Sequence, residues 1–272
     1  MQRPPLTDRA ALGRHRARAH EDALFAHRLA RASVEERLAE VNRTFTAPAL
    51  VTGHPAAWAD MLPGAAVVPD DERLALAAGA HDLVVHAMAL HWADDPVGQL
   101  VQCRLALRPD GLLLAVLPGG RTLHELRAAL AEAESQLTGG LSPRVAPMGE
   151  VRDLGALLQR AGLALPVADV EAHRVTYADA LALMRDLRAM GEGNALAARE
   201  RRAPPRALFA EAARVYAAAH PAEDGRVAAT LELVHLAGWA PSADQPKPLR
   251  PGSARARLAD ALAVPERPLP RD

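Results

Sequence analysis

The stretch HDLVVHAMALHWADDPVGQLVQCRLALRPDGLLLAVLPGG, residues 81–120, decides the fold of this chain. Leu83–Ala87 is an apolar run of the kind found in strands that are buried on both faces. Pro96 suits the first turn of the helix that follows, and Pro109-Asp110-Gly111 predicts a turn. A second apolar strand covers Leu112–Leu117. The order strand, helix, strand predicts a parallel, right-handed unit.

Strands and helices alternate on both sides of this unit. Strands are predicted at Ala49–Thr52 and Ala65–Val68 before it, and at Val167–Tyr177 and Val227–Ala237 after it. This order predicts an α/β fold whose mostly parallel, doubly wound sheet carries an antiparallel last strand.

Three divisions of the chain follow from the same pattern. We expect an N-terminal helical segment at residues 1–46, because the pattern from Leu6 to Val41 is helical. The α/β domain is predicted at 47–250, with a helical insertion at 178–224, and a C-terminal tail at 251–272.

The composition bounds the function. Hydrophobic residues make up 50% of 272 residues, which is enough for a large core, and a net charge of -1 argues against a nucleic-acid-binding surface. Cys103 is the only cysteine, so no internal disulfide and no cysteine metal cluster can form. Neither a signal peptide nor an apolar run of roughly 18 residues is visible, so we expect a cytoplasmic protein without a membrane span.

Three strings in the deciding stretch resemble a known family. Asp82-Leu-Val-Val, Leu90-His-Trp and Leu107-Arg-Pro-Asp-Gly-Leu-Leu are similar to strands four and five of class I methyltransferases, which use S-adenosylmethionine. The two late strands match the final hairpin of that family. The resemblance implies a Rossmann-like class I methyltransferase fold, with S-adenosylmethionine bound at the carboxyl ends of the parallel strands.

Motifs after residue 120 narrow the resemblance to the methyltransferase-like assembly factors of respiratory complex I. Mitochondrial members of that family are held to hydroxylate an arginine of a complex I subunit, whereas bacterial relatives are described as methyltransferases. The resemblance implies a protein partner, a complex I subunit. The strings that carry it are Gly119–Arg127, Gly139–Arg144, Val151–Gly155, Leu183–Glu192, Asn194-Ala195 and Gly238-Trp239.

The part of the sequence that should bind the cofactor departs from the family pattern. The turn after the first strand keeps one glycine, Gly53, and Pro55 removes a backbone donor from it. About 30 residues separate Gly53 from Asp82, where two strand–helix units would fill roughly 60. We therefore expect the second strand and its ribose-binding acid to be missing, with Asp70 and Asp71 at the end of strand three or capping a helix. Cofactor binding is expected to be weak or lost.

Candidate site residues follow the strand ends. His91 could act as a general base or an orienting donor, and Trp92 could line the pocket or pack with His91 at the sheet edge. One of Asp94 and Asp95 should cap the next helix, while the other could contact a cationic substrate such as arginine. We take His91 and Asp94 as catalytic candidates. The candidate cofactor contacts are Gly53, Asp70, Asp71, Ala87, Met88 and Trp92.

No metal site is predicted, because none of the 11 histidines shows zinc-type pairing on one helix face. Three functions stay open. The chain could be a methyltransferase-family enzyme acting on a protein in complex I assembly, an arginine hydroxylase, or a non-catalytic scaffold that has lost the cofactor.

Overall fold

The computed structural model describes residues 4–246, 260 and 263. Met1–Pro241 form one compact unit and Ser242–Asp272 a second. Most of the tail predicted at 251–272 lies outside the described residues, and the division at residue 46 stays a prediction. No helix within the described ranges is long and apolar enough to cross a membrane.

The larger unit is built on a six-stranded sheet in the order β2-β1-β3-β4-β6-β5. β2, β1, β3 and β4 pair in parallel, and β6 runs antiparallel to both of its neighbours. This confirms the predicted mostly parallel sheet with an antiparallel last strand. The strands are β1 (Pro48–Thr52), β2 (Ala66–Val68), β3 (His81–Ala87), β4 (Leu107–Pro118), β5 (Ala164–Tyr177) and β6 (Val227–Trp239).

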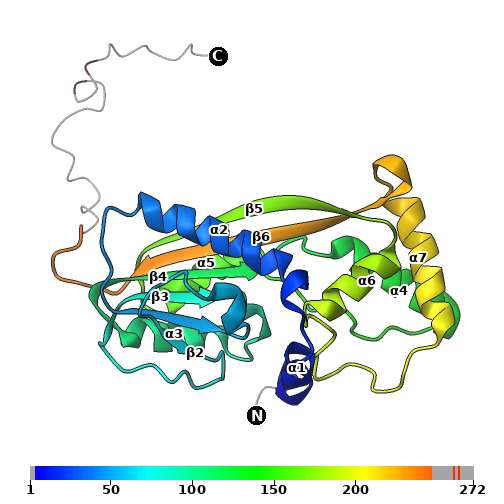
Figure 1. Ribbon diagram of the computed structural model, residues 1–272, viewed down its shortest axis with the longest axis horizontal. Coiled ribbons are helices and arrows are strands. Elements are labelled where there is room, and N and C mark those ends of the chain that lie inside the picture. The colour runs from blue at the N-terminus through cyan, green and yellow to red at the C-terminus, as the bar shows by residue number, and fades with distance from the viewer. Residues whose placement is uncertain (1–3, 247–259, 261–262, 264–272) are drawn as a thin grey trace, which may run out of the picture. The chain divides into compact units, whose positions relative to one another are not determined.

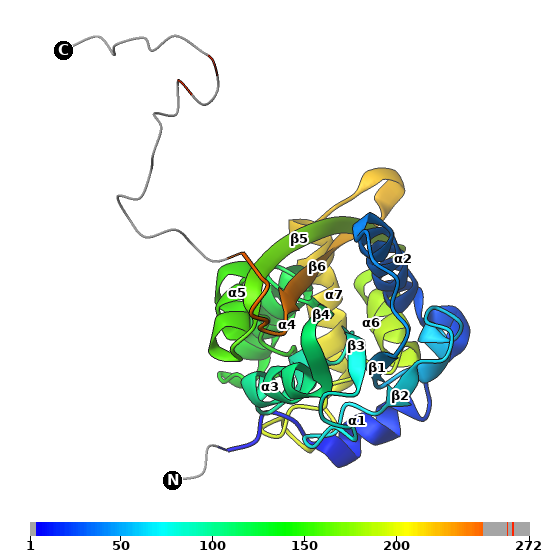
Figure 2. The same ribbon diagram turned by 90° about the vertical axis from the view of Figure 1, so that its left-hand side faces the viewer.

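Helices cover both faces of this sheet, as Figure 2 shows. α3 (Pro96–Ala106) and α5 (Val151–Arg160) pack on one face, and α2 (Phe25–Glu40) packs on the other together with the short helix η2 (Pro55–Trp58). All five residues of β1 are buried, as expected for a strand covered on both faces. Each face has its own aliphatic core, so the sheet is held from two sides.

A third group of helices packs at the far end of the long β5–β6 ribbon (Figure 1). It consists of α4 (His124–Thr138), α6 (Ala180–Ala189) and α7 (Arg206–Ala219), joined by one apolar cluster. The buried Tyr216 hydroxyl donates to the Ala228 carbonyl at 2.8 Å, which ties α7 to β6. α6 and α7 are the helices predicted between residues 178 and 224.

The structure corrects the prediction about the missing strand. β2 pairs directly with β1, with Val51 opposite Val68. In the doubly wound strand order 3-2-1-4-5-6, the neighbour of the first strand is the second one. β2 therefore holds the second position, and among the described residues no strand lies outside it. Chain length alone could not tell which of two neighbouring strands was absent.

Two N-terminal helical segments precede α2. They are α1 (Arg9–Arg16) and the short helix η1 (Glu21–Ala23). Asp8 caps α1 by accepting from the Ala11 N–H at 3.0 Å, and its other oxygen receives Arg199 at 2.8 Å. This double role ties the start of the chain to the segment after α6.

Candidate functional site

The carboxyl ends of β1, β3 and β4 meet at one edge of the sheet. Ala87, the last residue of β3, lies opposite Thr52 of β1 and Val116 of β4. Met88 then adopts a left-handed conformation with φ 50°, while its N–H donates to the Val116 carbonyl at 2.8 Å. This turn directs the short helix η3 (Leu90–Trp92) to the strand ends. β3 and β4 pair in parallel, which confirms the parallel strand–helix–strand unit predicted from residues 81–120.

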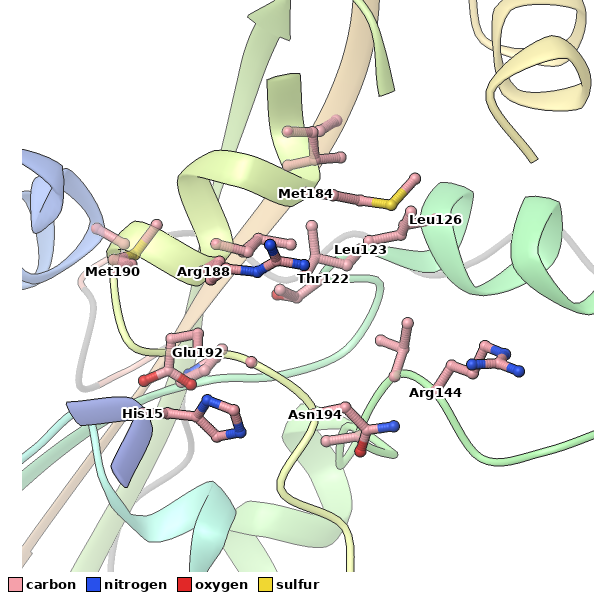
Figure 3. A pocket seen from close by; sticks show the side chains of 18 of the residues that line it. His15, Thr122, Leu123, Leu126, Arg144, Met184, Arg188, Met190, Glu192 and Asn194 are labelled. Atoms are coloured by element: carbon pink, nitrogen blue, oxygen red, sulfur yellow. The ribbon is translucent and has the colours of Figure 1, made fainter. Parts of the chain in front are cut away.

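A pocket of about 840 Å³ opens between this edge and the helices α4, α6 and α7. In Figure 3, Met184 and Leu126 lie along one side of it, and His15, Glu192 and Asn194 lie along the opposite side. The first set offers apolar surface, while the second offers polar groups from α1 and from the segment after α6. Such a pocket accepts a side chain that has an apolar stem and a polar end.

Glu192 is the carboxylate at the floor of this pocket. Gly191, at φ 85°, ends α6 in a left-handed turn in which the Glu192 N–H donates to the Leu187 carbonyl at 2.9 Å. The Trp92 indole N–H donates to Glu192 Oε2 at 2.9 Å, and His91 Nε2 lies 3.4 Å from the same oxygen.

These contacts decide the charge of Glu192. Burial alone would raise the pKa of its carboxyl, but the hydrogen bond with His91 and the charge of Arg16 lower that pKa to about 2. Glu192 is therefore ionised at neutral pH. The predicted pair His91 and Trp92 thus lies at the pocket and shares a carboxylate that the sequence prediction did not include.

Arg16 lies against Gly53 and Asp70, two of the residues predicted to contact the cofactor. A Cβ atom at Gly53 would overlap the Arg16 guanidinium, so this glycine is the residue that lets the arginine approach. Arg16 Nη1 donates to Asp70 Oδ1 at 2.6 Å, and Arg9 Nη1 lies 3.3 Å from Asp70 Oδ2. Burial would raise the pKa of Asp70, but the two arginines hold it below its ordinary value.

The remaining predicted cofactor contacts lie in different surroundings. Asp71 is mostly exposed and has one weak contact with Arg9, at 3.7 Å. Ala87 is fully buried in the sheet, whereas Met88 lines the pocket. A second, smaller hollow of about 400 Å³ lies here, and its lining includes Arg9, Arg16, Gly53, Asp70 and Asp71. The predicted set is thus divided, since Gly53, Asp70 and Asp71 line the small hollow while Met88 and Trp92 line the larger pocket.

Asp94 holds the start of the chain in place. Its Oδ1 accepts from the backbone N–H groups of Leu6 at 2.7 Å and Thr7 at 3.0 Å. Asp95 caps α3 by accepting from the Gly98 N–H at 2.8 Å, as predicted for one of the two aspartates. Asp94 is not among the residues that line the pocket.

Three side chains from distant parts of the sequence meet beside the pocket floor. One ligand atom each of His27, His54 and Glu192 lies within 4.8 Å of the others. His27 belongs to the first turn of α2, while His54 lies two residues after the end of β1. Burial lowers the pKa of His27 to about 3 and also lowers the pKa of His54, so both rings are neutral at pH 7. The prediction from spacing alone did not identify these residues, since they do not share one helix.

The pocket carries positive charge at several points. Arg18, Arg185 and Arg188 line it, and none of their side chains has a hydrogen-bond or ion-pair partner among the residues that the structure describes. Arg144 is held by Glu134, which also accepts from the Ser142 hydroxyl at 2.7 Å. Free arginines around the pocket favour a partner with acidic groups.

Sequence comparisons with known proteins find two groups of relatives. The chain is 37% identical to "Arginine-hydroxylase NDUFAF5, mitochondrial" of Danio rerio over 203 residues, which are 75% of this chain and 63% of the relative. It is 36% identical to "Malonyl-[acyl-carrier protein] O-methyltransferase" of Methylovorus sp. over 178 residues, 65% of this chain and 57% of that protein. No family model matches.

The solved structures support the fold. The YcgJ protein of Bacillus subtilis aligns with a TM-score of 0.50 and 11% identity, over 82% of this chain and all of that one. The molecule has the Rossmann-like class I methyltransferase fold. The chain spans less than two thirds of the length of the curated relatives described above. The hydroxylase relative is named as mitochondrial, so the comparisons do not support the predicted cytoplasmic location.

Proposed function

We propose that this chain, which has the class I methyltransferase fold and relatives named arginine hydroxylases, modifies an arginine side chain of a protein partner during respiratory complex I assembly. Hydroxylation is the reaction we favour. It would insert one oxygen atom of dioxygen into a C–H bond and reduce the other to water with two electrons from a co-reductant. Fold alone does not determine the reaction.

The observation that carries this proposal is the pocket with a polar floor at the strand ends. Its floor holds His91 and the ionised Glu192, and its wall includes apolar side chains of α4 and α6. An arginine has a long methylene stem and a polar end, which match that apolar wall and that polar floor. The unpaired Arg18, Arg185 and Arg188 would contact acidic residues of the partner around the target arginine.

The proposal does not place S-adenosylmethionine in the position usual for this fold. Arg16 covers Gly53, and it pairs with Asp70, the acid after the strand next to β1 that would otherwise hold the ribose hydroxyls. Binding of the cofactor there would require removal of a buried guanidinium from its carboxylate. We therefore propose that the family cofactor is bound weakly or not at all in this position.

A second candidate function is a non-catalytic scaffold for complex I assembly. The specific observation in its favour is the same Arg16–Asp70 pair, in which the acid expected to hold the cofactor is bound by an arginine of the chain. A scaffold needs the pocket as a binding surface but does not need the chemistry of His91.

A deletion strain tests the proposed function and separates the two candidates. We expect loss of the protein to lower the amount of assembled complex I and to remove the mass of one oxygen atom from one arginine of a peripheral-arm subunit. Complex I at the normal level and with unchanged arginines would contradict the proposal.

Complementation then distinguishes enzyme from scaffold. His91→Ala should restore assembly but not the modified arginine if the reaction and the assembly role are separable. A scaffold leaves no modified arginine even with the unchanged chain. His91→Ala is a cleaner variant than one that also removes Asp94, because Asp94 holds the backbone of Leu6 and Thr7. His124→Ala, a partly exposed histidine outside the pocket lining, is the matched control.

A further inference from the structure

We propose that His27, His54 and Glu192 bind one divalent transition-metal ion beside the pocket floor. Two imidazoles and one carboxylate are brought within 4.8 Å of one another by three separate segments. Two histidines and one carboxylate with open coordination positions are the ligand set of non-haem iron(II) oxygenases. The proposal deepens the proposed function, since oxygen insertion needs a redox centre, but binding of the ion is tested without that reaction.

Unpartnered ring nitrogens point to a missing ligand. His27 is 1% exposed and His54 is 6% exposed. Among the described residues, Nε2 of each ring is buried and has no hydrogen-bond partner. Buried polar atoms normally have a partner, and here two unpartnered ring nitrogens lie near an ionised carboxylate. A cation would bind Nε2 of His54 and a carboxylate oxygen of Glu192, and it would bind Nε2 of His27 once the ring proton of His27 has moved to Nδ1.

The carboxylate keeps an oxygen for this role. Trp92 and His91 both contact Oε2 of Glu192, and Oε1 takes part in no hydrogen bond among the described residues. The contacts from Trp92 and His91 orient the carboxylate, as neighbouring groups do for carboxylate ligands in metal sites. Gly191 lets the chain carrying Glu192 approach His54, since a Cβ there would lie 3.2 Å from His54 Cε1.

His27 couples the proposed site to a tryptophan. The Trp58 indole can only donate, and it donates to His27 Nδ1 at 3.1 Å, so the ring proton of neutral His27 is on Nε2. Metal binding at Nε2 requires the ring proton to move to Nδ1, where it faces the Trp58 indole N–H, so the hydrogen bond with Trp58 is lost. The loss of one hydrogen bond between neutral groups is small compared with the metal–ligand bonds gained. Occupancy of the site should therefore change tryptophan fluorescence.

Cobalt(II) is the probe that tests the site, because it reports its coordination by visible absorption. We expect the metal-free full chain to bind one equivalent of Co²⁺, with a change in tryptophan fluorescence at the same stoichiometry. His27→Ala and His54→Ala should each weaken binding by at least about tenfold. His27→Gln and His54→Gln, which keep more of the side-chain volume, serve if the alanine variants do not fold.

His235→Ala is the matched control, because His235 is also buried and also lies near a carboxylate, 3.6 Å from Glu171 Oε2. It should bind Co²⁺ like the unchanged chain. The proposal is overturned if the unchanged chain binds no Co²⁺ at millimolar concentration, or if folded variants of His27 and His54 bind it with unchanged affinity. Binding of Co²⁺ without any modified arginine in the cell would leave this site intact and reject the hydroxylase function instead.

Discussion

Two parts of one sheet edge differ in what fills them. At the ends of β1 and β2, the α1 helix inserts Arg16 against Gly53 and pairs it with Asp70, leaving a shallow hollow of about 400 Å³. At the ends of β3 and β4, a pocket of about 840 Å³ lies between the sheet edge and the helices α4, α6 and α7. The first part is closed by buried charge pairs, whereas the second is open and lined by unpaired arginines.

This difference lies in the side chains that pack at the strand ends and not in the sheet itself. The glycine turn and the acid after the next strand are both present, but an arginine of the same chain contacts them. The open part instead collects His91, Trp92 and Glu192. A family motif therefore identifies a position at the strand ends, and the side chains packed against that motif determine what can bind there.

The largest expected effect comes from breaking the closed part. Asp70→Asn removes the carboxylate that pairs with the buried Arg16, and an uncompensated buried charge costs about 3–5 kcal/mol. We expect the free energy of unfolding in urea to fall by about that amount. Asp71→Asn is the control, since Asp71 is 69% exposed and should change stability by no more than about 0.5 kcal/mol. Equal losses in the two variants would contradict the closed arrangement.

A smaller effect is expected in the loop that borders the open part. The hydrogen bond from Arg144, opposed by burial, lowers the pKa of Glu134 to about 2 from 4.5. A carboxyl with a lowered pKa stabilises the fold above pH 4.5, and that contribution is lost as the pH falls towards 2. Glu134→Gln should lower the free energy of unfolding by about 2 kcal/mol at pH 7 and by much less at pH 2.

The exposed neighbour Glu132 provides the comparison for that experiment. Its carboxylate contacts only Gln136, at 3.1 Å, in the described hydrogen-bond network. Glu132→Gln should leave stability within about 0.5 kcal/mol at both pH values. If the free energy of unfolding differs between the unchanged chain and the Glu134→Gln variant by the same amount at pH 7 and at pH 2, then the ion pair with Arg144 does not stabilise the loop.

Features of the fold could be predicted from the sequence where residues close together in the chain determine them. The β3–α3–β4 unit was predictable because apolar runs, Pro96 and the Asp95 cap act within a few residues. The position of β2 in the sheet was not, since spacing along the chain does not identify a strand's neighbour.

The candidate site was predictable only in part, for the same reason. His91 and Trp92 follow a strand end directly, and strand ends meet at the sheet edge. Glu192 joins them through a contact across 100 residues, and Arg16 reaches Asp70 across 54. Such contacts depend on how helices pack, which no local pattern records. The segment containing Glu192 was marked only by family resemblance.

The smallest effect on stability is expected from the open part itself. Arg188 lines the pocket, and its side chain has no hydrogen-bond or ion-pair partner among the described residues. Arg188→Ala should therefore change the free energy of unfolding by no more than about 0.5 kcal/mol. The same variant should weaken capture of the proposed protein partner. Strong destabilisation would mean that Arg188 supports the fold rather than a partner.

Titration of the full chain with S-adenosylmethionine by calorimetry tests the central claim, that the cofactor position is filled by the protein itself. Arg16 would have to leave both Gly53 and Asp70 before the cofactor could enter. We predict no binding, or binding with a Kd weaker than about 100 μM. A Kd near 1 μM, about -8 kcal/mol, would contradict the claim and restore an ordinary methyltransferase site.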